Sequence, residues 1–168
     1  PYIEGSFQKK GWDAVNDLIK VSKEKDTISI TLNGSRTLPA SVLSGIKGKD
    51  FSLNLDMENG FIWKINGTSI TAETPADIDL SVTNTAEYIP AALYSLISTN
   101  QNDFGFHLGR NGAFDFPSVL SVKADASCAG LMANLFWYDV ENGVLQCIQT
   151  VTVGGAFERS IPYADFTL

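Results

Sequence analysis

A chain of 168 residues has the length of one domain, and folding at this size buries roughly 70% of the unfolded chain's surface. Its 44% hydrophobic and 18% charged content is that of a globular protein and excludes intrinsic disorder. The net charge of −7 argues against nucleic acid as a partner, because phosphate binding depends on clustered Lys and Arg. No apolar run approaches the roughly 18 residues that span a bilayer, so we expect no membrane insertion.

The first half of the chain is predicted to alternate between short helices and strands. Residues 11–23 have apolar side chains at helical spacing, and residues 27–32 alternate between apolar and polar as a strand does. Pro39 suits the first turn of a second helix, where its missing N–H costs nothing, and residues 51–57 alternate again. Strand, helix and strand in one sheet imply a right-handed crossover and parallel neighbours.

Asn-Gly pairs are predicted to turn the chain back into antiparallel strands. Asn59-Gly60 precedes a strand over residues 61–65, and Asn-Gly readily supplies the positive φ angles of a tight turn. The series of apolar-Pro-Ala, short helix, Asp-Phe, strand and Asn-Gly recurs over residues 89–112, and a fainter copy covers residues 12–34. We therefore predict helix–strand repeats over residues 11–116.

Helical signals stop at residue 117, and the remaining segments are predicted to be strands. They are residues 119–122, 131–138, 144–153, 157–161 and 165–168. We predict a single α+β domain over residues 1–168. It would be a mixed sheet built from helix–strand repeats with Asn-Gly hairpins, closed by a C-terminal antiparallel β meander over residues 117–168.

The sequence gives little support to catalysis, and we expect no enzyme, no catalytic residue and no cofactor. His107 is the only histidine, lies on a predicted strand and is expected to be exposed, which leaves a Ser or Cys nucleophile without an evident base. Asp139, Glu141 and Asn142 cluster oxygens that calcium could use, but an ordinary hairpin turn explains them as well. Neither a GxGxxG nor a GxxxxGK[ST] motif is present, and no metal site is predicted.

The two cysteines are predicted to be buried free thiols. They flank a hairpin whose turn lies near residues 141–143. If Tyr138 faces Leu145, then Cys147 lies opposite Phe136, and Cys128 is far beyond disulfide reach.

Exposed aromatic side chains are the feature that could bind a ligand. Sugar rings present apolar C–H faces ringed by hydroxyls, so they need flat aromatic faces beside hydrogen-bonding groups. Trp137 and Tyr138 beside Asn134 and Gln146 could form such a ligand-binding platform. Adjacent strand residues point to opposite faces, so one aromatic is expected to be buried and the other partly exposed, and packing is the alternative role for both. Trp12 and Trp63 fall on apolar stripes and are expected in the core.

Five stretches carry a resemblance to a known type of module. They are residues 11–15, 39–43, 46–50, 59–67 (Asn-Gly-Phe-Ile-Trp-Lys-Ile-Asn-Gly) and 129–138. These resemble a non-catalytic module of extracellular or surface proteins of Firmicutes, associated with cellulosomes or S-layers. The resemblance covers nearly the whole chain, but its motifs are turns and core strands. It implies an extracellular or cell-surface location and, as a role, attachment to carbohydrate.

The expected function is therefore that of a non-catalytic carbohydrate-binding module of a bacterial extracellular, cellulosomal type of protein. Its partner would be a neutral plant polysaccharide, β-glucan or related, because the acidic chain would repel an anionic glycan. The alternative is a structural or protein-interaction module, a spacer or docking unit, whose partners are neighbouring protein modules. Because the chain begins at Pro1 without a signal peptide, we expect a piece of a longer protein.

Overall fold

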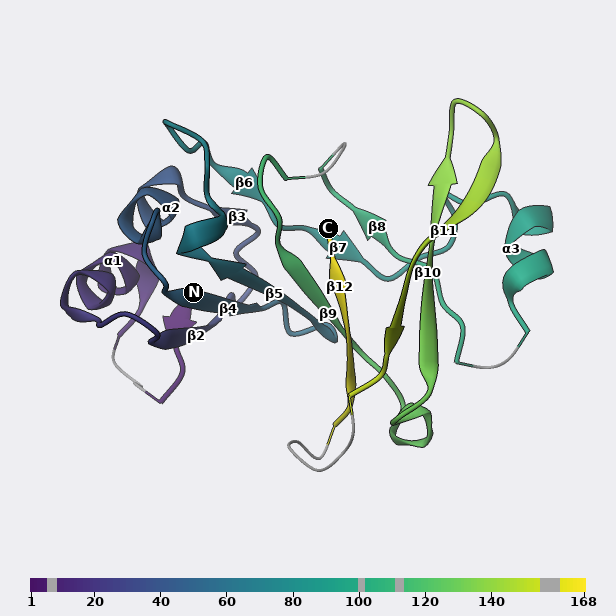
Figure 1. The fold of residues 1–168 in the computed structure, drawn as a ribbon, viewed down its shortest axis with the longest axis horizontal. Helices are drawn as coiled ribbons and strands as arrows, with labels where there is room; N and C mark the ends of the chain where they lie inside the picture. The colour runs from purple at the N-terminus through teal and green to yellow at the C-terminus, as the bar shows by residue number, and fades with distance from the viewer. Residues whose placement is uncertain (6–8, 100–101, 111–113, 155–160) are drawn as a thin grey trace. The chain divides into compact units, whose positions relative to one another are not determined.

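The computed structural model describes residues 1–168 except residues 6–8, 100–101, 111–113 and 155–160 (Figure 1). The described part is α+β, as predicted. Its helices are α1 (Gly11–Val21), α2 (Ala40–Ile46), α3 (Ala91–Ile97) and the short 3-10 helices η1 (Gly67–Ser69) and η2 (Ala126–Cys128). Its strands are β1 (Tyr2–Ile3), β2 (Thr27–Thr31), β3 (Thr37–Leu38), β4 (Ser52–Asp56), β5 (Phe61–Asn66), β6 (Ile78–Asp79), β7 (Val82–Thr83), β8 (His107–Leu108), β9 (Val119–Lys123), β10 (Met132–Asp139), β11 (Val144–Thr152) and β12 (Tyr163–Thr167).

The largest sheet is mixed, with the strand order β1-β2-β4-β5-β9-β12. β2 and β4 are parallel, whereas β1 pairs with β2 and β4 pairs with β5 in antiparallel fashion. The parallel pair is joined through α2, which is the crossover that the alternation of strand and helix predicts. Three two-stranded sheets accompany it: β10-β11, β3-β6 and β7-β8.

The chain groups into two compact units, which are described separately. Unit 1 comprises residues 1–81, 108–120 and 167–168, and unit 2 comprises residues 82–107 and 121–166. Each unit takes segments from both sides of residue 117. The units therefore do not follow the division that the change from helical to strand signals indicates.

The core of unit 1 lies between its two helices and one face of the sheet. α1 and α2 lie on the same side of β2, β4 and β5 (Figure 1). Along β4 and β5, every second side chain is buried and the ones between them are half-buried. The buried face therefore packs toward the helices, and the alternating pattern of the sequence sets which face that is. The buried side chains of these two strands are Leu53, Leu55, Phe61, Trp63 and Ile65.

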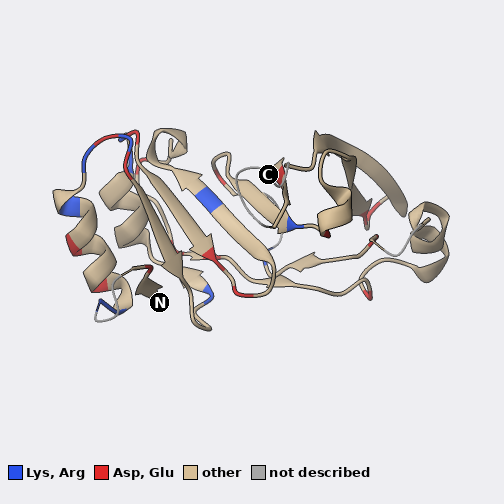
Figure 2. Ribbon diagram, turned by 90° about the horizontal axis from the view of Figure 1, so that it is seen from below, with Lys and Arg blue, Asp and Glu red and all other residues tan. Residues whose placement is uncertain are grey.

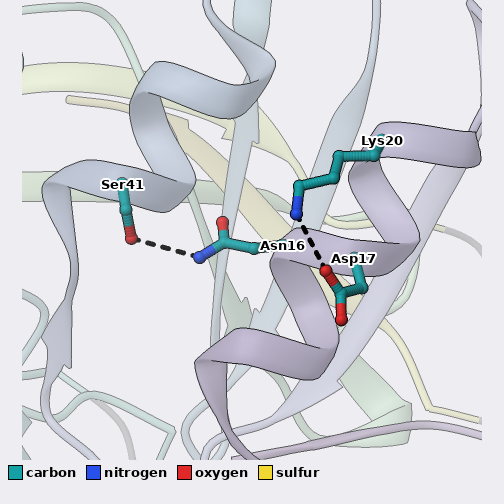
Figure 3. Close-up of polar contacts among 4 residues, drawn as sticks. All are labelled: Asn16, Asp17, Lys20 and Ser41. Atoms are coloured by element: carbon teal, nitrogen blue, oxygen red, sulfur yellow. Dashed lines mark hydrogen bonds and ion pairs between the residues drawn. The ribbon is translucent and has the colours of Figure 1, made fainter.

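The two helices of unit 1 approach each other closely at a glycine. A Cβ added at Gly45 of α2 would lie 3.4 Å from Cγ2 of Ile19 on α1. Beside this contact the Asn16 side-chain amide donates a hydrogen bond of 3.2 Å to Oγ of Ser41 (Figure 3). The ion pair of Lys20 with Asp17 in the same view is at 2.9 Å, but both side chains are more than 70% exposed. Such an exposed pair contributes little to stability, so apolar packing holds the helices together.

Trp63 is a buried side chain at the centre of unit 1, which confirms the expectation from its apolar stripe. It is 2% exposed, and its indole N–H donates a hydrogen bond of 2.9 Å to the backbone carbonyl of Leu80. Its ring centroid lies 4.7 Å from that of Phe114, at an angle of 45°. Trp12 on α1, in contrast, is only half-buried.

The β4–β5 connection contains Asn59-Gly60 but is longer than a two-residue turn. Positive φ angles occur at Glu58 (64°) and Gly60 (91°). The Asp56 carboxylate accepts a hydrogen bond of 2.7 Å from the Glu58 backbone N–H, which starts the turn before Asn59. A further Asn-Gly pair, Asn66-Gly67, opens η1.

The second predicted copy of the repeat is built less fully than the first. α2 buries three side chains, whereas α3 buries none and Leu96 is 76% exposed. The predicted strand that contains His107 is β8, which covers only two residues, and Asn111-Gly112 lies outside the described residues. The helix–strand repeat stays a prediction.

The predicted C-terminal meander is wrong in its connectivity. β10 and β11 pair only with each other within the described sheets, and β12 lies next to β9 in the large sheet. The β10–β11 hairpin is therefore inserted in the chain between two neighbouring strands of the large sheet and is not part of that sheet. Leu135 and Asp139 are the only residues that β10 and β11 bury. Of the strand predicted over residues 157–161, only Ile161 is described, and it is not part of a strand.

Charged side chains are mixed in sign on unit 1. Figure 2 shows both red and blue segments on α1, and the two colours alternate along the loop after it. α1 has Asp13 in its first turn and Lys20 in its last turn, which is the arrangement that complements the helix dipole. Among the helices that the structure describes, none combines the length and the apolar character needed to cross a membrane.

Candidate functional site on the β10–β11 hairpin

The β10–β11 hairpin carries the four residues that the sequence proposes as a ligand platform. Its strands pair antiparallel from Met132 with Thr152 to Asp139 with Val144. Tyr138 pairs with Leu145 and Phe136 with Cys147, which confirms the predicted register. The register shifts between Leu135 and Phe136, so the hairpin has a β-bulge, which bends and twists a strand locally.

The structure divides the four predicted residues between the two faces of the hairpin. Trp137 is 51% exposed and lies directly opposite Gln146. Asn134 and Tyr138 alternate with Trp137 along β10, so they point to the other face, where Asn134 pairs with Thr150. The two aromatics point to opposite faces, as expected, but the expectation that one of them is buried is wrong: Trp137 is exposed and Tyr138 is half-buried. One platform of four residues is therefore not formed.

The Asn134 amide is already engaged within the hairpin. Its Oδ1 accepts a hydrogen bond of 2.7 Å from the Thr150 hydroxyl. On the same face the Thr152 hydroxyl lies 3.5 Å from Sδ of Met132. These cross-strand contacts stabilise the hairpin, and they leave Trp137 with Gln146 as the pair best placed to contact a ligand.

The acidic side chain of Asp139 forms hydrogen bonds within the hairpin turn. The Asp139 side chain, 8% exposed, accepts hydrogen bonds from the backbone N–H groups of Glu141 at 3.0 Å and Asn142 at 3.2 Å. The Asn142 side-chain amide donates a third bond, at 2.5 Å. Bonding from Asn142, and secondarily from the turn's backbone, lowers the pKa of the Asp139 carboxyl from its ordinary value. Among the described ranges, no group of three or more His, Cys, Asp or Glu residues could hold a metal ion.

The lowered pKa of Asp139 predicts how acid affects the hairpin. A carboxyl whose folded pKa is lowered contributes stability above its unfolded pKa, and that contribution is lost as the pH falls through the folded pKa. We expect the thermal midpoint of the chain to fall between about pH 5 and about pH 2, and to fall less in Asp139→Asn, which keeps an acceptor but cannot titrate. Thermal unfolding followed by circular dichroism measures this, and equal pH slopes for both proteins would contradict it.

The cysteines and the histidine differ in part from their predicted surroundings. Cys128 and Cys147 are free, as predicted, but Cys128 is half-buried and Cys147 is exposed. The expectation of burial is wrong because most of β11 is exposed. His107 is half-buried, with its ring stacked 3.7 Å from that of Tyr88 at 20°, so the expectation of an exposed strand histidine is also wrong.

A groove on unit 1, which sequence reasoning missed, is a second candidate site. We call it the sheet-face groove. It has a volume of about 330 Å³ and is lined by Thr27, Ser52, Asn54, Lys64, Ile65, Asn66, Ser69, Pro117, Ser118, Val119 and Thr167. The sequence does carry a signal for it, namely the polar residues that alternate with the apolar ones along β4 and β5. The apolar residues of that alternation predict the core, and the polar ones predict the opposite face of the sheet.

Comparison of the chain with protein-family models, with curated proteins and with solved structures found no match. The resemblance to modules of Firmicute surface proteins therefore stays a prediction. Any function must be argued from the side chains of the hairpin and of the groove.

Proposed function

We propose that the chain is a non-catalytic carbohydrate-binding module of a bacterial extracellular or cell-surface protein of the cellulosomal type. It holds neutral plant polysaccharide, β-glucan or related, through an exposed aromatic side chain. The observation that carries the proposal is the position of Trp137 on β10, half-exposed and directly opposite Gln146.

The pair of Trp137 and Gln146 combines the two properties that a sugar ring requires. The indole offers a flat apolar surface for the C–H face of the ring, and the Gln146 amide both donates and accepts hydrogen bonds beside it. Both side chains stand on paired strands, so binding orders them at a smaller entropic cost than it would in a loop. The net charge of −7 favours a neutral glycan over an anionic one.

Affinity electrophoresis tests the proposal with two matched variants. In gels containing hydroxyethylcellulose, xyloglucan, β-mannan or xylan, the wild type should be retarded by at least one polysaccharide. Trp137→Ala should weaken that retardation about two- to tenfold, because aromatic stacking contributes about 0.5–1.5 kcal/mol. Tyr138→Ala, on the other face of the same strand, should keep it.

The folding of both variants is checked by circular dichroism before the gels are read. Trp137→Ala changes an exposed side chain and should keep the free energy of unfolding within about 0.5 kcal/mol. No retardation of the wild type by any of the four polysaccharides would refute the proposal. Loss of retardation in Tyr138→Ala alone would move the site to the other face of the hairpin.

A second candidate function, a structural or protein-interaction module, is favoured by a different observation. The hairpin and its flanks expose a group of large apolar side chains: Leu131, Met132, Trp137, Val140, Val144 and Ile148. Apolar surface gathered on one element commonly marks a protein contact. Concentration-dependent self-association of the wild type that Ile148→Lys abolishes and Trp137→Ala spares, with no retention on glycan, would establish this function instead.

A further inference from the structure

The sheet-face groove lies on the side of the unit 1 sheet that the helices leave open. Ser52 and Asn54 on β4 alternate with the buried Leu53 and Leu55, so they point away from α1 and α2. Its volume of about 330 Å³ is at the lower end of the roughly 300–1,000 Å³ typical of ligand pockets. A small molecule is therefore the occupant that its size suits.

The register of the strands arranges the polar side chains of the groove in rows. Thr27 of β2 pairs with Ser52 of β4, and Ser52 pairs in turn with Asn66 of β5. In the next row, Asn54 pairs with Lys64. Neighbouring strands lie about 4.8 Å apart, so the rows present hydroxyl and amide groups at regular short intervals on one rigid surface.

Some of these groups are already engaged, and others are not. The Asn66 amide donates to Asp50 and to Ser52, each at 3.0 Å, and its oxygen accepts from Thr68. Asn54, in contrast, forms no side-chain hydrogen bond with any residue that the structure describes. It is half-buried in the floor of the groove, so both its donor and its acceptor can serve a ligand.

Ser118 adds a buried hydroxyl to the wall of the groove. Its residue is 3% exposed, and within the described residues Oγ is the one buried side-chain polar atom without a hydrogen-bond partner. The Ser118 backbone is fixed by two hydrogen bonds with Leu168, at 3.0 and 2.8 Å. An unsatisfied buried hydroxyl costs about 1–3 kcal/mol. Rotation of the Ser118 side chain toward the groove would let a ligand hydroxyl pair with Oγ and remove that cost.

The composition of the groove indicates the chemistry of its ligand. Residues with hydroxyl or amide side chains line most of it, together with the apolar Ile65, Pro117 and Val119. No carboxylate or aromatic side chain lines it, and Lys64 is the one cation among the lining residues. An anion would be held by several cations and would be repelled by the net charge of −7. Groups that both donate and accept are suited instead to ligand hydroxyls, which do the same.

We propose that the sheet-face groove is a binding site for an uncharged, hydroxyl-rich small molecule of the size of a monosaccharide or disaccharide. Asn54 forms its principal hydrogen bonds, and Ser118 contributes one more from the wall. The site lies wholly within unit 1 and involves neither Trp137 nor the hairpin, so it does not rest on the polysaccharide-binding function.

Titration of the ¹⁵N-labelled chain tests the site directly. Glucose, mannose, xylose and cellobiose are added separately while two-dimensional ¹H–¹⁵N spectra follow the Asn54 side-chain NH₂ group and the Ser118 backbone N–H. At least one sugar should shift both signals in a saturable manner. Absence of saturable shifts with all four sugars, or saturable shifts with sodium phosphate or acetate alone, would overturn the proposal.

Three variants assign the binding to the groove. Asn54→Leu, of similar size but apolar, and Ser118→Ala should each weaken sugar binding about five- to tenfold. Ser118→Ala should leave the unfolding midpoint unchanged or raise it, since it removes an unsatisfied hydroxyl. If the hydroxyl had a purely structural role, its removal would lower the midpoint instead. Ser44→Ala, at an exposed position of α2 outside the groove lining, is the matched control and should bind as the wild type does.

The same titration separates this proposal from the hairpin site. Trp137→Ala should weaken retention on polysaccharide and keep the saturable shifts at Asn54. If a sugar shifts the Ser118 backbone N–H with the same affinity in the wild type and in Asn54→Leu, Asn54 does not hold the sugar and the proposal fails, whatever the polysaccharide gels show.

Discussion

Replacing Trp63 by alanine should lower the free energy of unfolding by about 3–5 kcal/mol, the range for deletion of a large buried aromatic side chain. Trp63 is 2% exposed, and its ring packs 4.7 Å from that of Phe114, so its removal leaves a cavity that the paired strand β5 cannot close. The substitution also leaves the Leu80 carbonyl without the hydrogen bond of 2.9 Å that it accepts from the indole N–H. Chemical denaturation followed by circular dichroism measures the change.

Trp63→Phe separates the two parts of this effect. Phenylalanine fills most of the volume but cannot donate to Leu80, so the variant should lose about 1–3 kcal/mol, the cost of leaving a buried carbonyl unsatisfied. Trp137→Phe, at an exposed position, is the control and should change stability by less than about 0.5 kcal/mol. A Trp63→Ala variant as stable as the wild type would contradict the described core.

Gly67→Ala should be as damaging, for a steric reason. A Cβ at Gly67 would lie 2.0 Å from the backbone oxygen of Ile46 and 2.6 Å from that of Lys49. Both are backbone atoms, and Ile46 is the last residue of α2, so the helix end must move away from η1. Overpacking typically costs about 1–3 kcal/mol and more where backbone must shift, so we expect at least about 3 kcal/mol.

The matched control for Gly67 is another glycine without a positive φ angle. At Gly154 the nearest atom to an added Cβ is the Tyr163 carbonyl oxygen, at an ordinary contact distance of 3.4 Å. Gly154→Ala should therefore change the unfolding midpoint little, within about 1 kcal/mol. Equal unfolding midpoints for Gly67→Ala and Gly154→Ala would show that Gly67 does not lie against the backbone at the end of α2.

Local patterns in the sequence predict the elements of unit 1 well. The alternation in residues 51–57 and 61–65 corresponds to β4 and β5, and the parallel pairing of β2 with β4 follows from the helix between them. In these segments hydrophobic periodicity, turn chemistry and burial agree, so pattern and structure coincide.

Long-range pairing is what the sequence does not predict. The strand character of β9 to β12 is evident locally, but nothing local shows that β12 returns to β9 while β10 and β11 pair apart. Similarly, the apolar stripe of α3 predicts a buried face, yet no residue of that helix is buried. A stripe is buried only if the fold supplies a partner surface, which short-range pattern does not encode.

The candidate sites show the same division. Alternation correctly places Trp137 and Tyr138 on opposite faces, and the predicted register sets Trp137 against Gln146. The sheet-face groove was missed because it joins residues of β2, β4 and β5 to Ser118 and Thr167, which are distant in the sequence. Its key property, the unpartnered buried Oγ of Ser118, exists only in the folded chain.

Fluorescence quenching at Trp137 tests the central claim, that polysaccharide contacts this side chain, most directly. Trp63 is buried and Trp12 half-buried, so acrylamide reaches mainly the exposed Trp137. In the wild type, the polysaccharide that retards the chain should shield this fluorescence from acrylamide, and in Trp137→Phe the shielding should disappear. Retention on that polysaccharide with unchanged acrylamide quenching in the wild type would contradict the claim.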